Sequence, residues 1–184
     1  MKSSGHKANH TLVLGWGNEL RGDDGAGRAA ARAVADRQWP QVLVEELHQL
    51  TPEWAAHFAH VQRVIFLDAC RAGQFPDGPA CLDAPWQSHV CVQPLQPMPR
   101  GETPHSVHRV SPAYLLALAN ELYGARPEAW WIGIPLMQAE WGTTFSPQTS
   151  AAIAAAVDAC GDLITGTVSR DKEREMVQAE RNSV

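Results

Sequence analysis

The stretch that decides the fold is "TLVLGWGNELRGDDGAG", residues 11–27, where a short apolar run leads into a glycine-rich turn with two adjacent carboxylates. The apolar run predicts a buried strand over 12–15, and the alanine- and arginine-rich sequence after the turn predicts a helix over 25–37. A strand followed directly by a helix is the repeating unit of α/β folds. In such folds, functional residues collect where strands end, so the turn is a candidate site.

This turn lacks the spacing of a phosphate-binding loop. Gly15 and Gly17 are followed by the next glycine only at position 22, which breaks the Gly-x-Gly-x-x-Gly pattern of dinucleotide-binding loops. No Gly-Lys-Ser or Gly-Lys-Thr follows, and Asp23 and Asp24 would repel a phosphate at the start of the helix. One of these acids is a candidate helix N-cap, with nearby glycines allowing tight packing. Because one cap is sufficient, the second carboxylate is available as a ligand.

Strands and helices alternate along the rest of the chain. Further strands are predicted at 42–47, 64–67 and 130–134, with one or two short strands near 88–92. Further helices are predicted at 52–60, 111–123 and 147–164, each opened by a Thr-Pro or Ser-Pro pair. Such a pair supplies a hydroxyl N-cap and then a proline at the first helical position. The alternation predicts an α/β fold with a largely parallel sheet of about five strands.

Composition limits the classes of protein to which the chain can belong. Its 184 residues are 45% apolar and 19% charged, which fits one globular domain, expected over 11–168 between a polar lead at 1–10 and a charged tail at 169–184. The net charge of −5 offers no basic surface for nucleic acid. No apolar run approaches the roughly 20 residues needed to cross a membrane, and the lead is unlike a secretory signal. We therefore expect a cytoplasmic protein with no membrane insertion, whose four cysteines are free thiols.

Polar residues follow several predicted strands. Asp23 and Asp24 follow the first strand and His48 follows the second, while Asp68 ends the apolar run "VIFLD" at 64–68. A carboxylate at the end of a buried strand is costly to desolvate unless it is paired, hydrogen-bonded or bound to a metal. A turn or capping role is the alternative for Asp68.

Two histidines stand just before the predicted helix at 111–123, in "HSVHRVSP", residues 105–112. Either His105 or His108 is a candidate ligand, and simple surface exposure is the alternative for both. Two carboxylates and an imidazole would form a mixed oxygen and nitrogen site for a divalent metal, with positions open for water or substrate. Cys70 is a weaker candidate nucleophile, whose pKa the neighbouring Arg71 would lower.

Taken together, these motifs resemble the hydrogenase maturation endopeptidases over about residues 11–165. The opening motif is similar to the family pattern G-x-G-N-x-L-x-x-D-(D/E)-G-x-G. The other segments that carry the resemblance are "QLTPEWAAHFAHVQRVIFLDA", "HSVHRVSPAYLLALANELYG", "WWIGIP" and "FSPQTSAAIAAAV". The family fold is a three-layer α/β/α sandwich, in agreement with the alternation of strands and helices.

The resemblance implies an aspartic-type endopeptidase that removes the C-terminal extension of a nickel–iron hydrogenase large-subunit precursor after nickel insertion. It assigns Asp24 and Asp68 as catalytic, and Asp24, Asp68 and His108 as contacts to nickel carried by the substrate. His108 matches the family pattern better than His105, because one residue and an apolar residue separate it from the Ser that opens the helix. Asp23 is left for capping or for supporting Asp24, and its replacement by Asn is expected to have only a mild effect on precursor processing.

The mechanism and the function both have alternatives at this stage. A metal ion could polarise the scissile carbonyl or activate a water, or Asp68 or Asp24 could act as a general base. A non-proteolytic nickel-binding accessory protein for hydrogenase assembly is the main functional alternative. A nucleotide-binding enzyme on a similar sandwich is a second alternative, which the acidic turn disfavours. The long segment 71–110 is expected to set substrate choice.

Overall fold

The computed structural model describes residues 11–71, 90–99, 101 and 110–166, which build a five-stranded sheet in the order β2-β1-β3-β5-β4. Four strands are parallel, and β4 runs antiparallel to β5 at one edge. The prediction of a mostly parallel sheet of five strands is confirmed. The strands are β1 (Thr11–Trp16), β2 (Val42–Leu47), β3 (Arg63–Cys70), β4 (Cys91–Pro94) and β5 (Glu128–Pro135).

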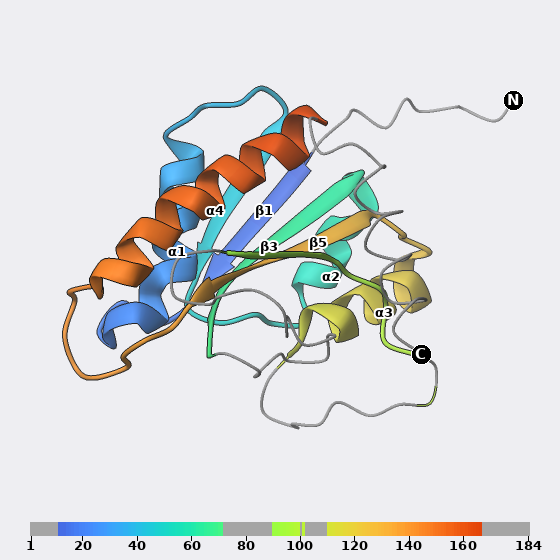
Figure 1. The fold of residues 1–184 in the computed structure, drawn as a ribbon. Coiled ribbons are helices and arrows are strands. Elements are labelled where there is room, and N and C mark those ends of the chain that lie inside the picture. The colour runs from blue at the N-terminus through green and yellow to red at the C-terminus, as the bar shows by residue number, and fades with distance from the viewer. Residues whose placement is uncertain (1–10, 72–89, 100, 102–109, 167–184) are drawn as a thin grey trace, which may run out of the picture.

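Helices cover both faces of this sheet, so the molecule is the predicted three-layer α/β/α sandwich (Figure 1). On one face lie α1 (Ala26–Ala35) and α4 (Pro147–Thr165). On the other lie α2 (Trp54–His57) and α3 (Pro112–Tyr123). Two short 3-10 helices, η1 (Gly22–Gly25) and η2 (Phe58–His60), precede α1 and follow α2.

Two of the three predicted helix starts are confirmed. The hydroxyls of Ser111 and Ser146 each accept a 3.2 Å hydrogen bond from the backbone N–H three residues on, and a proline follows each serine. The start at Thr51 is wrong, because the chain first makes a turn and α2 begins only at Trp54, with no side-chain cap. There the Thr51 carbonyl accepts the Trp54 N–H at 3.2 Å, so the backbone itself closes the turn.

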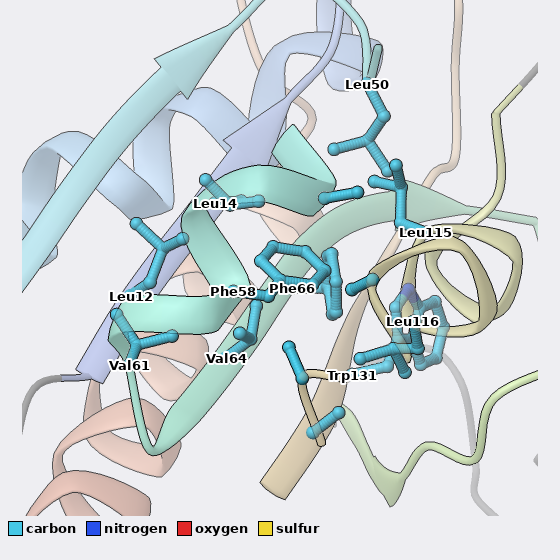
Figure 2. Packing of buried hydrophobic residues seen from close by; sticks show 14 of the residues in the cluster. Leu12, Leu14, Leu50, Phe58, Val61, Val64, Phe66, Leu115, Leu116 and Trp131 are labelled. Atoms are coloured by element: carbon cyan, nitrogen blue, oxygen red, sulfur yellow. The ribbon is translucent and has the colours of Figure 1, made fainter. Parts of the chain in front are cut away.

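The core is divided by the alternation of side chains along each strand. Leu12 and Leu14 of β1 and Val64 and Phe66 of β3 pack against α2 and α3, as Figure 2 shows. The residues between them point to α1 and α4. Asp68 lies two residues beyond Phe66 on β3, and it therefore belongs to the face of the sheet that α2 and α3 cover.

Two glycines allow α1 to lie directly on the ends of the central strands. A Cβ on Gly27 would sit 2.4 Å from the carbonyl oxygen of Trp16 and 2.5 Å from that of Leu67. One on Gly15 would sit 2.2 Å from the Gly27 carbonyl oxygen. The expected tight packing next to the opening motif is thus confirmed for Gly27, and it brings the start of α1 against both β1 and β3.

Several expectations fall on parts of the chain outside the described residues. These are the lead at 1–10, the tail at 169–184, most of the segment 71–110, and both His105 and His108. No helix among the described residues is long and apolar enough to span a membrane. Cys70 and Cys160 are free and buried, but Cys91 is disulfide-bonded, which corrects the expectation that all four thiols are free.

Candidate functional site

The candidate site lies at the carboxyl-terminal edge of the sheet, where β1 and β3 end side by side. The register pairs Gly15 with Leu67, so the ends of the two strands are adjacent and Asp68 follows immediately. Asp24 lies in η1, which directly follows the β1 turn and packs against β3. The structure therefore brings the two predicted carboxylates, Asp24 and Asp68, to the same edge.

The turn between β1 and α1 folds back on itself to present Asp24. Gly17 has a φ of +139°, and a Cβ at this position would lie 1.9 Å from the Asp24 carbonyl oxygen, so only glycine fits. The backbone N–H of Asn18 donates to Asp24 Oδ2 at 3.1 Å, and its side-chain Oδ1 accepts the Leu20 N–H at 3.0 Å. The half-buried Asp24 carboxylate is thus held by its own turn.

Asp23 points in a different direction and caps neither η1 nor α1. Its side chain is 0% exposed, and neither η1, in which it lies, nor the following α1 has a side-chain cap. Oδ2 accepts hydrogen bonds from the N–H groups of Met137 and Gln138 at 3.0 Å each and from the Ser146 hydroxyl at 2.9 Å. Oδ1 accepts the Ser146 N–H at 2.7 Å. Asp23 therefore joins the first turn to the loop between β5 and α4, which corrects the interpretation of Asp23 as a cap of its own helix.

These contacts also decide the charge of Asp23. Burial by itself would raise its pKa, but hydrogen bonds from Ser146 and Gln138 outweigh burial and hold the pKa below its ordinary value. The carboxylate is therefore ionised at neutral pH. An ionised carboxylate offers about four acceptor positions, and four donors already occupy those of Asp23. Asp24, not Asp23, is consequently the residue of this pair that can bind a ligand.

An ion-pair network anchors the other side of the turn. Arg28 Nη1 lies 3.0 Å and Arg32 Nη2 lies 2.8 Å from the carboxylate of Glu19, and both arginines also pair with Glu46 at the end of β2. Hydrogen bonds to Glu46 and Glu19 raise the pKa of Arg32. This network was not predicted, although two arginines four residues apart on a predicted helix were a usable signal in the sequence.

Cys70 is unsuited to nucleophilic catalysis. Burial, and secondarily the negative charge of Asp68, raise the pKa of its thiol to about 12. The expectation that Arg71 would lower this pKa is therefore wrong, because the dominant effect is desolvation inside the cluster under α2 and α3. Asp68 itself is half-buried, two residues before Cys70 on the same strand.

The remaining candidates contribute less. His48 directly follows β2, as predicted, and its side chain is exposed. No group of three or more His, Cys, Asp or Glu residues that could hold a metal occurs within the described part of the chain. The third predicted ligand, His108, lies outside that part. A groove of about 550 Å³, lined in part by Arg126, Pro127 and Glu128, lies at the opposite edge of the sheet, away from Asp24 and Asp68.

The fold and this edge together define an α/β/α sandwich that carries acidic residues where nucleotide-binding sandwiches carry a phosphate loop. Neither a family model nor a curated protein matches the chain in sequence.

Solved structures do match. The NiFe hydrogenase maturation protease HybD from Thermococcus kodakarensis is 23% identical over 84% of this chain and 99% of its own, with a TM-score of 0.58. The hydrogenase 2 maturation peptidase of a Thaumarchaeota archaeon is 22% identical over 85% and 98%, also with a TM-score of 0.58. The maturating endopeptidase HybD of E. coli is 17% identical over 86% and 94%, with a TM-score of 0.56. The chain therefore has the fold of the hydrogenase maturation proteases.

Proposed function

We propose that the chain is a hydrogenase maturation endopeptidase, which removes the C-terminal extension of a nickel–iron hydrogenase large-subunit precursor. The observation that carries this proposal is the placement of Asp24 and Asp68 at one edge of a sheet whose fold is that of solved maturation proteases. The resemblance of the opening motif supports the same assignment.

In this proposal, nickel is bound to the precursor, and the protein recognises it there. Asp24 and Asp68 offer half-buried carboxylate oxygens at the edge, while the acceptor positions of Asp23 are already filled. An imidazole from His108 would complete a mixed oxygen and nitrogen set, which suits nickel. His108 stands three residues before Ser111, the N-cap of α3, which covers the same side of the sheet that Asp68 follows.

Hydrolysis of the peptide bond then needs an activated water. A carboxylate of Asp68 or Asp24 accepts a proton from the water as its oxygen attacks the scissile carbonyl carbon. The same proton passes to the leaving nitrogen as the carbon–nitrogen bond breaks, so the carboxylate returns to its ionised state. This scheme makes the enzyme an aspartic-type peptidase and gives no role to Cys70, whose thiol stays protonated near neutral pH.

The proposal is tested by incubating the protein with the nickel-loaded large-subunit precursor from the same organism. Mass spectrometry of the precursor should show a single shortened product with wild-type protein, and no product with Asp24→Asn. Asp158→Asn on α4 is the matched control, because that carboxylate is 79% exposed and remote from the edge. Binding of nickel or of the precursor without any shortening would contradict the proposal and would support the accessory-protein function.

A further inference from the structure

An exposed apolar surface lies on the two loops that meet beside Asp24. Leu20 on the first turn is 59% exposed, and Met137 and Trp141 on the loop between β5 and α4 are 45% and 82% exposed. We call these three side chains the apolar platform. Large apolar side chains exposed on adjoining loops beside a candidate site are typical of an interaction surface.

The platform is held in place by the backbone. The Gly142 N–H donates to the Leu20 carbonyl at 3.0 Å, and the Gly22 N–H donates to the Gly142 carbonyl at 2.7 Å. These two bonds hold the two loops side by side, with Leu20 on one loop and Trp141 on the other. The buried Asp23 carboxylate binds the Met137 N–H at 3.0 Å. A surface fixed in this way loses little conformational freedom when a partner binds.

The platform is also continuous with the candidate site. The Leu20 N–H donates to Asn18 Oδ1, and the Asn18 N–H donates to the carboxylate of Asp24. The carbonyl of Arg21 accepts the Asp24 N–H at 3.2 Å. The platform therefore adjoins the turn that carries Asp24, within reach of the residues beside a peptide bond bound there.

The chemistry of the surface indicates what kind of partner it fits. Trp, Met and Leu supply an apolar centre, and the exposed side chains of Arg21 and Glu140 border it with opposite charges. An apolar centre with a charged rim is the anatomy of a protein–protein interface, and tryptophan is among the residues that contribute most to binding.

We propose that the apolar platform binds an apolar segment of the polypeptide substrate next to the bond that is cut. The inference rests on the proposed function and adds its recognition surface. A second copy of this chain is a poorer occupant, because a lasting dimer through the platform would cover Asp24 and close the candidate site.

The test compares the double variant Leu20→Ser/Trp141→Ser with wild type and with Leu122→Ser. Leu122 is the matched control, since it is 60% exposed but lies near the C-terminal end of α3. The large-subunit precursor is the probe, and both its binding, by titration calorimetry, and its shortening are measured. The double variant should raise the dissociation constant and KM by about tenfold or more. Its kcat should stay unchanged, because the platform binds substrate and transition state alike.

The possible outcomes separate the platform from the proposed function. Binding and shortening equal to wild type in the double variant would overturn the platform and leave the proposed function intact. Tight binding that depends on Leu20 and Trp141, with no shortening by any protein, would retain the platform as a precursor-binding surface but overturn the peptidase. No binding of the precursor by wild-type protein would overturn both. A wild-type dimer that dissociates in the double variant, seen by sedimentation, would overturn the platform as a substrate surface.

Discussion

Replacing Asp23 with Asn is expected to destabilise the whole protein, although the change removes only a charge. Every described group that contacts the Asp23 carboxylate is a hydrogen-bond donor: two N–H groups and a hydroxyl at Oδ2, and one N–H at Oδ1. The amide of asparagine has a single acceptor oxygen. In either orientation, its NH₂ group therefore replaces an oxygen that accepted a backbone N–H, and it faces that N–H instead. The side chain is fully buried, so water cannot relieve the conflict.

The arrangement that costs least keeps the amide oxygen at the Oδ2 position and loses the bond to the Ser146 N–H. One buried donor is then left without a partner, at about 1–3 kcal/mol, and the other bonds lose their charge assistance. We expect Asp23→Asn to lower the free energy of unfolding by about 2–4 kcal/mol. Asp24→Asn should lower the free energy of unfolding by less than about 1 kcal/mol. The Asp24 carboxylate is half-buried, and among the described residues it accepts one hydrogen bond, from the Asn18 N–H.

The assay is urea unfolding of the two variants and wild type across pH. The pKa of Asp23 is lowered in the folded state, so its stabilisation is fully present above the unfolded pKa of about 3.9. This stabilisation is lost as the pH falls through the lower folded value. The difference in free energy of unfolding between wild type and Asp23→Asn should therefore become smaller below about pH 4. An Asp23→Asn protein within about 0.5 kcal/mol of wild type at pH 7 would refute the reasoning.

Asp68→Asn should leave the fold intact and slow precursor shortening by about 10²–10⁴-fold, measured by mass spectrometry; a change of only a fewfold would make Asp68 a structural residue. Gly27→Ala should lower the free energy of unfolding by about 1–3 kcal/mol, because its Cβ would lie 2.4 Å from the Trp16 carbonyl oxygen and 2.5 Å from that of Leu67. Cys70, with a pKa of about 12, should resist alkylation by iodoacetamide at pH 8, where the thiolate fraction is about 10⁻⁴. Rapid labelling of the folded protein at Cys70 would contradict its burial.

Local pattern was sufficient for most of the secondary structure. The run at 11–16 is apolar and is followed by a glycine turn and an alanine-rich helix, and the structure has β1, η1 and α1 there. The Ser-Pro pairs before α3 and α4 predicted both starts, because a cap depends only on residues a few positions apart. The same signal failed at Thr51, where four helical residues of α2 come too late to use the hydroxyl as a cap.

The sequence also placed Asp24 and Asp68 at one edge, since parallel strands bring their carboxyl ends together. Local pattern did not separate Asp23 from Asp24, and only the family resemblance distinguished them. The four donors that bind Asp23 belong to residues more than 110 positions later in the chain, and no local pattern carries that information. Only tertiary structure, in closing the loop after β5 over the first turn, decided which carboxylate is structural.

The pKa of the Cys70 thiol likewise could not be predicted from the sequence. The neighbour Arg71 suggested a reactive Cys70, yet burial beneath α2 and α3 dominates and raises the thiol pKa. By itself the sequence determined the order of elements, the class of fold and the strand ends at which chemistry is possible, because these follow from short-range periodicity. Tertiary structure alone decided which of those polar groups are buried, which are hydrogen-bonded and which face water, because desolvation and long-range donors come from segments far away in the chain.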